Sequence, residues 1–341
     1  MTVRVGVLGG GTVGGALVAR LVADRDAIRL KSGIDLEVRK VAVRDLSKPR
    51  SFSLKSDRVT DDAWSVVTDP SIDVIVEAMG GLDPAGELIL AAVRAGKPVV
   101  TANKELIATR GEEIIEAAKR SGVSVMYEAA VGGGIPVIRP LAESLAGEDI
   151  DVVSGIVNGT TNYILTAMTK EGRSYEDALA EAQRLGYAEA DPAADVSGRD
   201  AAFKTSILAG LAFGERVDPW EVACEGIEGV TAEDVAAATS RGEVIKLIGS
   251  ARRGTDGRVE ARVEPINLPA EHPLAGVNGV TNAIFIEGPS VGRLLFTGPG
   301  AGGEPTASAI LGDLIQVASR GRGPRKRSPH DPKPTRPVLH R

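Results

Sequence analysis

The sequence predicts an α/β fold in which a doubly wound parallel sheet is followed by a second, α+β domain. Apolar runs of strand length alternate with helical patterns through the first part of the 341-residue chain, as they do in βαβ units. A glycine-rich turn stands directly after the first apolar run. After Ile150 the segments become richer in strands, which indicates a second packed unit, since domains usually contain about 100–200 residues.

The elements of the first part follow one another closely. Strands are expected near residues 3–8, 36–43, 74–77, 98–101 and 124–128, and helices near residues 12–23, 84–95 and 105–120. Gly96 and Gly122 follow two of these helices, at the position where a left-handed C-terminal residue is usual.

The second part mixes strands and helices. Strands are expected near residues 151–157, 258–264, 280–287 and 291–296, and helices near residues 163–170, 175–185 and 197–213. A last helix near residues 305–318 follows the glycine-rich GPGAGGEPTA and is expected to return to the first domain. We therefore predict one domain at residues 1–134 joined by residues 299–319, a second at residues 135–298, and a disordered basic tail at residues 320–341.

The composition predicts a soluble protein that acts on small molecules. The formal net charge is −6, and basic residues concentrate only after Ser319, so the body has no basic surface for nucleic acid. No apolar stretch approaches the roughly 20 residues that a membrane-spanning helix requires. The first residues enter an apolar strand without a secretory signal, so we expect a cytoplasmic location and no membrane partner.

The scarcity of cysteine and histidine excludes several kinds of catalytic site. Cys224 is the single cysteine, which excludes internal disulfides and zinc sites with several thiolates. His330 and His340 lie in the terminal tail, and only His272 belongs to the globular part. A histidine base or a zinc site with several histidines is therefore not expected.

The glycine-rich turn predicts a nucleotide site. Gly9, Gly11 and Gly14 form a G-x-G-x-x-G pattern between the first strand and the first helix, the context that gives this pattern its meaning. The first glycine permits a tight turn, the second lets the main chain approach a pyrophosphate, and the third lets helix and sheet pack closely. We predict a Rossmann-type domain that binds NAD or NADP; the alternative is a plain strand-to-helix turn.

The end of the second strand bears on the choice between the two cofactors. An acidic residue there favours the ribose hydroxyls of NAD, and a basic one favours the phosphate of NADP. Arg44 precedes Asp45 at this position, with Lys48 nearby. The sequence therefore favours NADP and leaves NAD open, and a solvated Arg44 that binds no ligand is the alternative.

Two further segments carry residues suited to catalysis. In PVVTANKELIA, Lys104 follows the carboxyl end of a predicted parallel strand, where doubly wound sheets bind their ligands. In LGYAEADPAADVSGRDAAFK, Asp200 and Lys204 are four residues apart and share one face of a helix. The acidic residues that precede Lys204 in this segment are Glu189, Asp191, Asp195 and Asp200.

A purely structural interpretation of the second segment stays open. Ser197 with Asp200 resembles a capping box, and Asp200 with Lys204 resembles an exposed ion pair. Asp191 with Pro192 resembles a helix start. This interpretation does not explain why so many carboxylates lead into a lysine and an apolar helix.

The second segment resembles the signature of homoserine dehydrogenases. The spacing agrees from Ala182 and Gly186 through Asp195 and Asp200 to Lys204. The resemblance extends to TANKELIA, YEAAVGGGIP, IVNGTTNYIL and GPGAGGEPTASA, from about residue 3 to residue 318. It implies the reversible, NAD(P)H-dependent reduction of L-aspartate 4-semialdehyde to L-homoserine, in the synthesis of threonine and methionine.

The resemblance also implies roles for residues. Lys204, backed by Asp200, is the expected proton donor to the aldehyde oxygen, and Lys104 is a second catalytic lysine. Hydride delivery to a carbonyl creates an alkoxide that requires such an acid, and two neighbouring lysines are expected to have depressed pKa values. The expected substrate residues are Gly186, Glu189, Asp195 and Asp200. The expected cofactor residues are Gly9, Gly11, Thr12, Val13, Gly14, Arg44, Lys104, Gly186, Glu189 and Gly302.

A monovalent cation and a partner subunit are implied in the same way. The family binds a sodium-like cation, and here its ligands would be the Glu128 side chain and the carbonyls of Val131, Gly133 and Ile135, all hard oxygen donors. Without the resemblance this loop is a strand-to-helix turn. The resemblance further implies a homodimer built on the sheet of the second domain.

The chain departs from the family after Ser319. Many homoserine dehydrogenases continue into a regulatory domain that binds an amino-acid effector, and the residues here are too few and too polar to form one. We expect a form without feedback inhibition through such a domain. Two alternatives to the function stay open: another Rossmann dehydrogenase acting on an amino-acid semialdehyde, and a catalytically silent dinucleotide-binding sensor.

Overall fold

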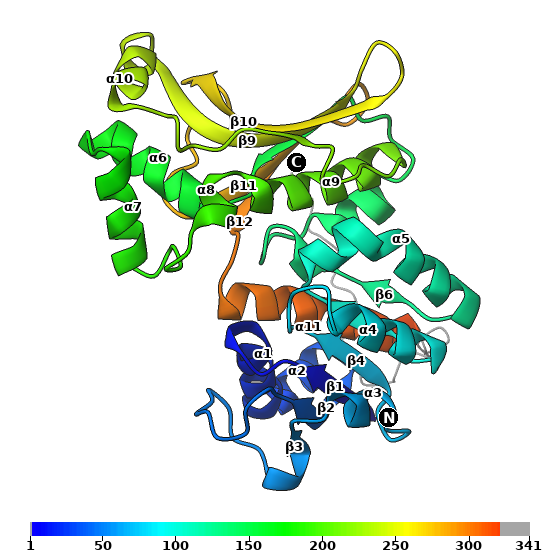
Figure 1. The fold of residues 1–341 in the computed structure, drawn as a ribbon. Coiled ribbons are helices and arrows are strands. Elements are labelled where there is room, and N and C mark those ends of the chain that lie inside the picture. Colours follow the sequence, from blue (N-terminus) through cyan, green and yellow to red (C-terminus); the bar gives the residue numbers. More distant parts are fainter. Residues whose placement is uncertain (1, 321–341) are drawn as a thin grey trace, which may run out of the picture.

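Two sheets organise the protein. The computed structural model describes residues 2–320, and Figure 1 shows one sheet with its helices in the lower half and the other in the upper half. The first sheet has the strand order β3-β2-β1-β4-β5-β6, and its strands pair in parallel. The order reverses between β1 and β4, as in a doubly wound nucleotide-binding fold. The predicted fold class is confirmed.

The five strands and three helices predicted for the first domain are confirmed, whereas β3, α2 and α3 were not predicted. The strands are β1 (Thr2–Leu8), β2 (Asp35–Ala42), β3 (Val59–Thr60), β4 (Val74–Glu77), β5 (Val99–Thr101) and β6 (Val125–Met126). The helices are α1 (Thr12–Ala23), α2 (Arg25–Ser32), α3 (Ala63–Val67), α4 (Ala85–Arg94) and α5 (Lys104–Ser121), with a 3₁₀ turn η1 (Ser56–Arg58). Gly96 and Gly122 have φ angles of 74° and 66°, so the expected left-handed positions are confirmed.

The second sheet is mostly antiparallel, in the order β12-β11-β7-β9-β10-β8. Its strands are β7 (Val152–Ile156), β8 (Ala223–Cys224), β9 (Glu243–Arg253), β10 (Val259–Pro269), β11 (Thr281–Gly288) and β12 (Gly292–Pro299). The helices are α6 (Gly159–Glu171), α7 (Tyr175–Arg184), α8 (Ala193–Val196), α9 (Arg199–Phe213), α10 (Ala232–Ser240) and α11 (Gly303–Arg320). The sequence did not predict β9, although this strand joins β7 to β10 in the sheet.

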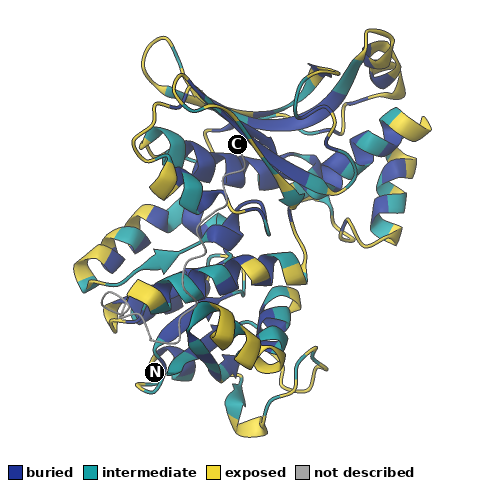
Figure 2. Cartoon of the chain, turned by 180° about the vertical axis from the view of Figure 1, so that it is seen from behind, coloured by how far each residue is buried: buried dark blue, intermediate teal, exposed yellow. Residues whose placement is uncertain are grey.

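Helices cover both faces of the first sheet, and its central strands β4 and β5 are buried (Figure 2). On one face, Leu17 of α1 and Ile310 of α11 belong to the same apolar core as Val7 of β1. On the other face, Leu88 of α4 and Ile114 of α5 pack together in a second core. Because α11 packs against α1, the last described helix completes the nucleotide-binding fold.

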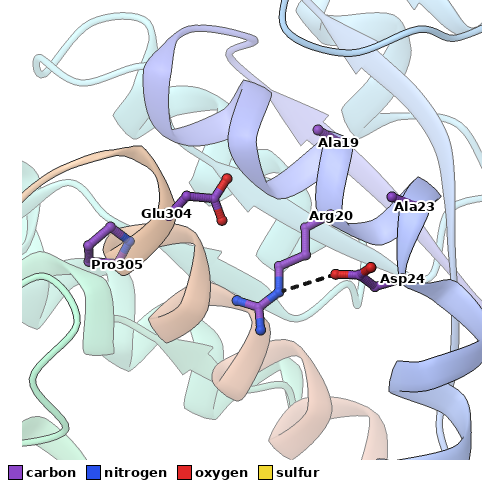
Figure 3. A pocket seen from close by; sticks show the side chains of 6 residues that line it. All are labelled: Ala19, Arg20, Ala23, Asp24, Glu304 and Pro305. Atoms are coloured by element: carbon purple, nitrogen blue, oxygen red, sulfur yellow. Dashed lines mark ion pairs between the residues drawn. The ribbon is translucent and has the colours of Figure 1, made fainter.

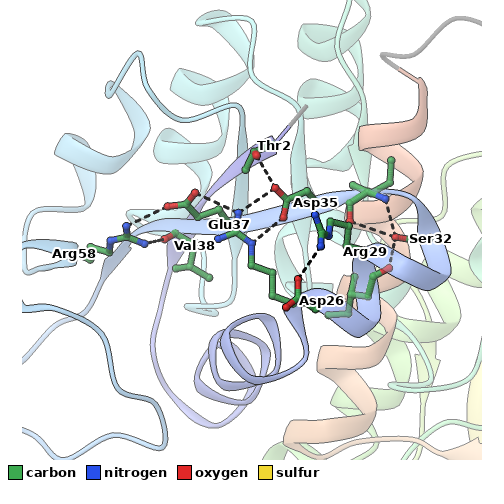
Figure 4. Close-up of polar contacts among 11 residues, drawn as sticks. Thr2, Asp26, Arg29, Ser32, Asp35, Glu37, Val38 and Arg58 are labelled. Atoms are coloured by element: carbon green, nitrogen blue, oxygen red, sulfur yellow. Dashed lines mark hydrogen bonds and ion pairs between the residues drawn. The ribbon is translucent and has the colours of Figure 1, made fainter.

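Ion pairs connect α2 and η1 to β2 (Figure 4). The Arg25 guanidinium lies 2.8 Å from Asp35 Oδ1 and 3.5 Å from Glu37 Oε2. Arg58 contacts the other oxygen of Glu37 at 3.1 Å. Hydrogen bonds from Arg25 and Thr2 lower the pKa of Asp35 to about 2. These contacts hold β2 in place, and Arg44 lies two residues beyond the carboxyl end of this strand.

Two connections between the sheets run side by side. The Gly134 N–H donates to the Pro299 carbonyl at 3.0 Å, and a Cβ added to Gly133 would lie 2.5 Å from the main chain of Gly300. The loop after β6 and the loop before α11 therefore touch, close to the domain boundaries expected at residues 134 and 299. Within residues 2–320, no helix is long and apolar enough to cross a membrane. The expected basic tail and the question of a regulatory domain concern residues outside this described range.

Candidate active site

The glycine-rich turn is shaped by close contacts and leaves one side open. Gly9 has a φ of 99°, and an added Cβ would lie 2.5 Å from the Ala78 carbonyl oxygen; on Gly14 it would lie 2.0 Å from the Gly9 oxygen. Added to Gly11, it would meet no described atom within 4 Å. No side chain caps α1, which leaves the N–H groups of its first turn, at Thr12 and Val13, available to an anion. The turn therefore fits a dinucleotide pyrophosphate.

Two arginines lie beside this turn. Arg44 lies two residues after the end of β2 and is exposed, without a polar partner among residues 2–320. Arg50, which the sequence did not single out, donates to the Gly10 carbonyl at 3.1 Å and also to the Asp45 carbonyl. The first arginine is free to bind a ligand, whereas the second supports the turn itself.

The start of α11 lies beside the start of α1. Gly302, a predicted cofactor residue, has a φ of 115° directly before α11, and a Cβ added to Gly303 would lie 3.0 Å from the Thr12 oxygen. A hollow of about 660 Å³ opens along the outer side of this contact (Figure 3). It is lined by Ala19, Arg20, Ala23, Asp24, Glu304 and Pro305, none of which is a predicted catalytic residue.

One buried carboxylate joins the two predicted catalytic lysines. Lys104, the first residue of α5, places its Nζ 3.0 Å from Asp200 Oδ1. Lys204, one turn along α9, places its Nζ 2.6 Å from Asp200 Oδ2 and donates to the Val157 carbonyl at 2.7 Å. An ammonium has three donors, so one N–H of Lys204 has no partner among residues 2–320. Helices α5 and α9 thus bring two lysines to one carboxylate, and an ammonium held in this way can donate a proton to a reacting oxygen.

The two lysines lower the pKa of the Asp200 carboxyl more than its burial raises it. Burial of Asp200 favours its neutral form, but Lys204 and Lys104 outweigh it and hold the pKa well below the usual range. In turn, the attraction of Asp200 raises the pKa of Lys104 above that of an ordinary lysine. The expectation of a depressed pKa was therefore wrong for Lys104, because a carboxylate separates the two ammonium groups.

Asn158, which the sequence did not single out, donates hydrogen bonds to two carboxylates of the site. Its Nδ2 donates to Asp195 Oδ1 at 2.7 Å and to Asp200 Oδ2 at 2.9 Å, and its Oδ1 accepts from the Thr161 N–H to cap α6. Burial raises the pKa of Asp195, and this hydrogen bond opposes the rise. The asparagine before Gly-Thr-Thr is an ordinary helix-capping signal, which did not reveal its second contact.

The structural interpretation of the acidic segment does not hold for its central residues. Helix α9 is preceded by Gly198 with a φ of 81° and without a side-chain cap, so Ser197 and Asp200 form no capping box. Asp200 and Lys204 are each only 9% exposed, and their ion pair is buried rather than solvated. A buried ion pair is weak evidence for stability alone, which favours a chemical role.

The remaining predicted substrate residues lie on the loop after α7. Gly186 has a φ of 77° and is exposed. Glu189 is exposed as well, and its carboxylate has no partner among residues 2–320; Gln183 donates only to its main-chain carbonyl, at 3.2 Å. Thr160, at the start of α6, donates to the Tyr187 carbonyl at 2.7 Å. This bond places the loop against the helix that Asn158 caps.

The Glu128 carboxylate does not fit the predicted role of a cation ligand. It is 2% exposed, and Oε1 accepts from the N–H groups of Val137 and Ile138 at 2.6 and 2.8 Å. Oε2 accepts from the N–H and the Nε of Arg139 at 3.0 and 3.1 Å. Both oxygens are therefore already occupied by donors, which corrects the side-chain part of the predicted ligand set.

The main-chain part of that set is compatible with a cation. The carbonyl oxygens of Val131, Gly133 and Ile135 accept no hydrogen bond within residues 2–320, so they remain available as hard ligands. No cluster of three or more His, Cys, Asp or Glu side chains suited to a metal occurs in this range. Any cation in this loop would therefore depend on main-chain oxygens.

Comparison with known protein families matches both halves of the chain. The family model for homoserine dehydrogenase matches residues 136–315, and the model for the homoserine dehydrogenase NAD binding domain matches residues 9–128. The homoserine dehydrogenase of Synechocystis sp. is 51% identical over 320 residues, which are 93% of this chain and 73% of that protein. The enzyme of Corynebacterium glutamicum is 48% identical, over 93% of this chain and 72% of that protein.

Solved structures agree with the sequence relatives. A homoserine dehydrogenase from Thiobacillus denitrificans superposes with a TM-score of 0.87 at 45% identity, covering 93% of this chain and 73% of that one. A hyperthermophilic archaeal homoserine dehydrogenase in complex with NADPH superposes with a TM-score of 0.79 at 30% identity, covering 94% of this chain and 98% of that one.

Proposed function

The chain belongs to the homoserine dehydrogenase family, and we propose that Lys204 is the acid of its reaction. The enzyme is an NAD(P)-dependent oxidoreductase that interconverts L-aspartate 4-semialdehyde and L-homoserine. The observation that supports the role of Lys204 is its buried contact with Asp200, which also holds Lys104.

In the direction of reduction, a C–H bond and an O–H bond form. The reduced nicotinamide cofactor, when bound, supplies the hydride to the aldehyde carbon. Lys204 holds a proton at Nζ and donates it to the aldehyde oxygen, which becomes the hydroxyl of homoserine. Asp200 and the Val157 carbonyl hold the ammonium in place, and a positioned acid of this kind typically contributes about 10²–10⁴-fold in rate.

The other site residues bind the substrate. We propose that Asp195, with Glu189 on the loop beside it, receives the ammonium of homoserine, since a small ammonium ion requires carboxylate partners. Asn158 orients Asp195 toward Asp200. Lys104 neutralises the second oxygen of Asp200 and assists orientation. The loop that carries Gly186 and Glu189 also contacts the cofactor in this proposal.

Substrate comparison tests the function directly. Homoserine and other hydroxy amino acids are offered to the purified enzyme with the oxidised cofactor, and NAD(P)H formation is followed. Aspartate, which has no hydroxyl group to oxidise, is the negative control. We expect the highest kcat/KM with homoserine. A different amino-acid substrate with a higher kcat/KM would instead support another semialdehyde dehydrogenase, and the absence of turnover would support the silent sensor.

We propose that NADP is the preferred cofactor, bound at its phosphate by Arg44. Arg44 is exposed and unpartnered at the end of β2, where a basic residue suits that phosphate. Arg44→Ala should raise KM for NADPH roughly tenfold or more and leave KM for NADH nearly unchanged. Arg39→Ala, on the exposed side of the same strand, is the matched control. Equal effects on both cofactors would contradict the assignment.

We also propose that a sodium-like cation binds the main-chain carbonyls of Val131, Gly133 and Ile135. Glu128 then shapes the loop rather than touching the ion, because its oxygens are occupied. A bound ion stabilises the folded state, so thermal unfolding should occur at a higher temperature in sodium chloride than in tetramethylammonium chloride of equal ionic strength. Equal unfolding temperatures would contradict the cation site.

A further inference from the structure

A buried carboxylate at the carboxyl end of β4 has no part in the chemistry described so far. Glu77 is 0% exposed, and no lysine or arginine forms an ion pair with it within residues 2–320. A buried carboxylate is costly unless hydrogen bonds satisfy its oxygens. The donors that satisfy Glu77 therefore identify what this residue holds in place.

Glu77 joins the loop after β4 to the last residue of β5. Its Oε1 accepts from the N–H groups of Met79 at 2.7 Å and Gly80 at 3.1 Å, in the loop after β4. Its Oε2 accepts from Thr101 Oγ1 at 2.5 Å, at the end of β5. Glu77 and Thr101 are also partners in the sheet register. One carboxylate thus joins the loop after β4 to the end of the adjacent parallel strand β5, at the edge where such sheets bind their ligands.

The contacts continue from Thr101 to the start of α5. Thr101 Oγ1 accepts from the Asn103 N–H at 3.0 Å. Asn103 Oδ1 accepts from the Leu106 N–H at 3.1 Å and caps the helix, while its Nδ2 donates to the Gly81 carbonyl at 2.7 Å. Lys104 is the first residue of this helix, so the direction of its side chain depends on the cap.

Lys104 has few other restraints. Its side chain is 39% exposed, and its one ion pair within residues 2–320 is the 3.0 Å contact with Asp200. Packing alone therefore does not fix its Nζ. A lysine loses rotamer entropy when it is held in one conformation, so the position of its Nζ depends on a rigid main chain at the start of the helix.

We propose that Glu77 is a positioning residue of this active site, which acts through Thr101 and Asn103 to hold Lys104 beside Asp200. The inference rests on the proposed catalytic role of Lys104. Glu77 itself supplies no proton and touches no reacting atom. It sets the relative position of the loops after β4 and β5. That position determines where the Nζ of Lys104 lies relative to Asp200.

Thr101→Val removes the hydroxyl that donates to Glu77 and changes the shape of the side chain little. We expect kcat to fall roughly 10- to 100-fold, since misplacement by about 1 Å has effects of this size, with cofactor affinity largely retained. The alkaline limb of the pH profile should move to lower pH, because a displaced Lys104 loses the attraction of Asp200 that raises its pKa. Thr101→Ser retains the hydroxyl and should restore activity.

A matched control and a second variant accompany this test. Thr109→Val, whose hydroxyl donates only to the Glu105 carbonyl within α5, should leave kcat unchanged. Glu77→Gln keeps the side-chain shape and one acceptor oxygen but offers an amide to Thr101, so it should lower kcat in the same way. The Glu77→Gln enzyme replaces Thr101→Val in this test if the Thr101→Val enzyme does not fold.

A double-mutant cycle with Lys104→Ala decides whether Glu77 and Thr101 act through Lys104. We expect either substitution to lower kcat by less than about twofold further in the Lys104→Ala enzyme, since coupled residues are not additive. Equal losses in both backgrounds, or normal kcat in both single variants, would overturn the positioning role. If Lys104→Ala is itself fully active, the catalytic role of Lys104 fails instead, which separates the two claims.

Discussion

Asp200 sets the charges of the active site, because it contacts both lysines. The residue types and spacings of Lys104, Asp200 and Lys204 are readable in the sequence. The arrangement around the carboxylate is not, since Lys104 arrives from α5, far from the others in the chain. For this reason the sequence led us to expect depressed pKa values for both lysines, whereas in the structure one carboxylate contacts both and raises the pKa of Lys104.

Asp200→Asn tests this electrostatic arrangement. Attraction to Asp200 is the main cause of the raised pKa of Lys104, so the protonated lysine persists to higher pH in the native enzyme. Without the carboxylate the pKa of Lys104 falls, and the alkaline limb of the kcat/KM profile should move to lower pH. Asp191→Asn, in the same segment but exposed, is the control and should leave the profile unchanged. An unmoved alkaline limb in Asp200→Asn would contradict the arrangement.

At the scale of elements, regular hydrophobic patterns were predicted well and interrupted ones were not. The bounds of β4 and α1 agree with the prediction residue for residue. The missed strand β9 contains Lys246, which is 2% exposed and donates to Asn162 Oδ1 at 2.9 Å and to the Val277 carbonyl at 2.6 Å. Burial lowers the pKa of this lysine to about 8. A charged residue whose partners are distant in the chain cannot be recognised as buried from local sequence.

Two glycines of the nucleotide turn should respond differently to substitution. Gly14→Ala places a Cβ 2.0 Å from a main-chain oxygen, so thermal unfolding should occur at a clearly lower temperature. Gly11→Ala places its Cβ in open space and should leave the unfolding temperature nearly unchanged, while Kd for NADPH rises roughly tenfold or more because the methyl group occupies the pyrophosphate site. Normal NADPH affinity in a folded Gly11→Ala enzyme would contradict the proposed binding mode.

At the scale of the whole molecule, the second sheet ends in an open strand. Among the strands of residues 2–320, β12 pairs only with β11. Most of its residues are exposed, and Leu295 is 43% exposed. An exposed edge strand that carries an exposed leucine favours pairing with another chain, which is the kind of interface that the family resemblance leads us to expect. Leu295→Lys should convert the dimer to a monomer in light scattering, and Arg293→Lys on the same strand should not. A monomeric native enzyme, or a Leu295→Lys dimer, would contradict this interface.

Kinetics of the Lys204→Ala enzyme test the proposed mechanism most directly, with kcat for L-aspartate 4-semialdehyde and Kd for NADPH measured on the same preparation. Because the acid that serves the aldehyde oxygen is removed, kcat should fall by roughly 10²–10⁴-fold while Kd stays unchanged, and Lys104→Ala should have the smaller effect. A Lys204→Ala enzyme that binds NADPH normally and turns over within about twofold of the native kcat would contradict the assignment of Lys204 as the acid.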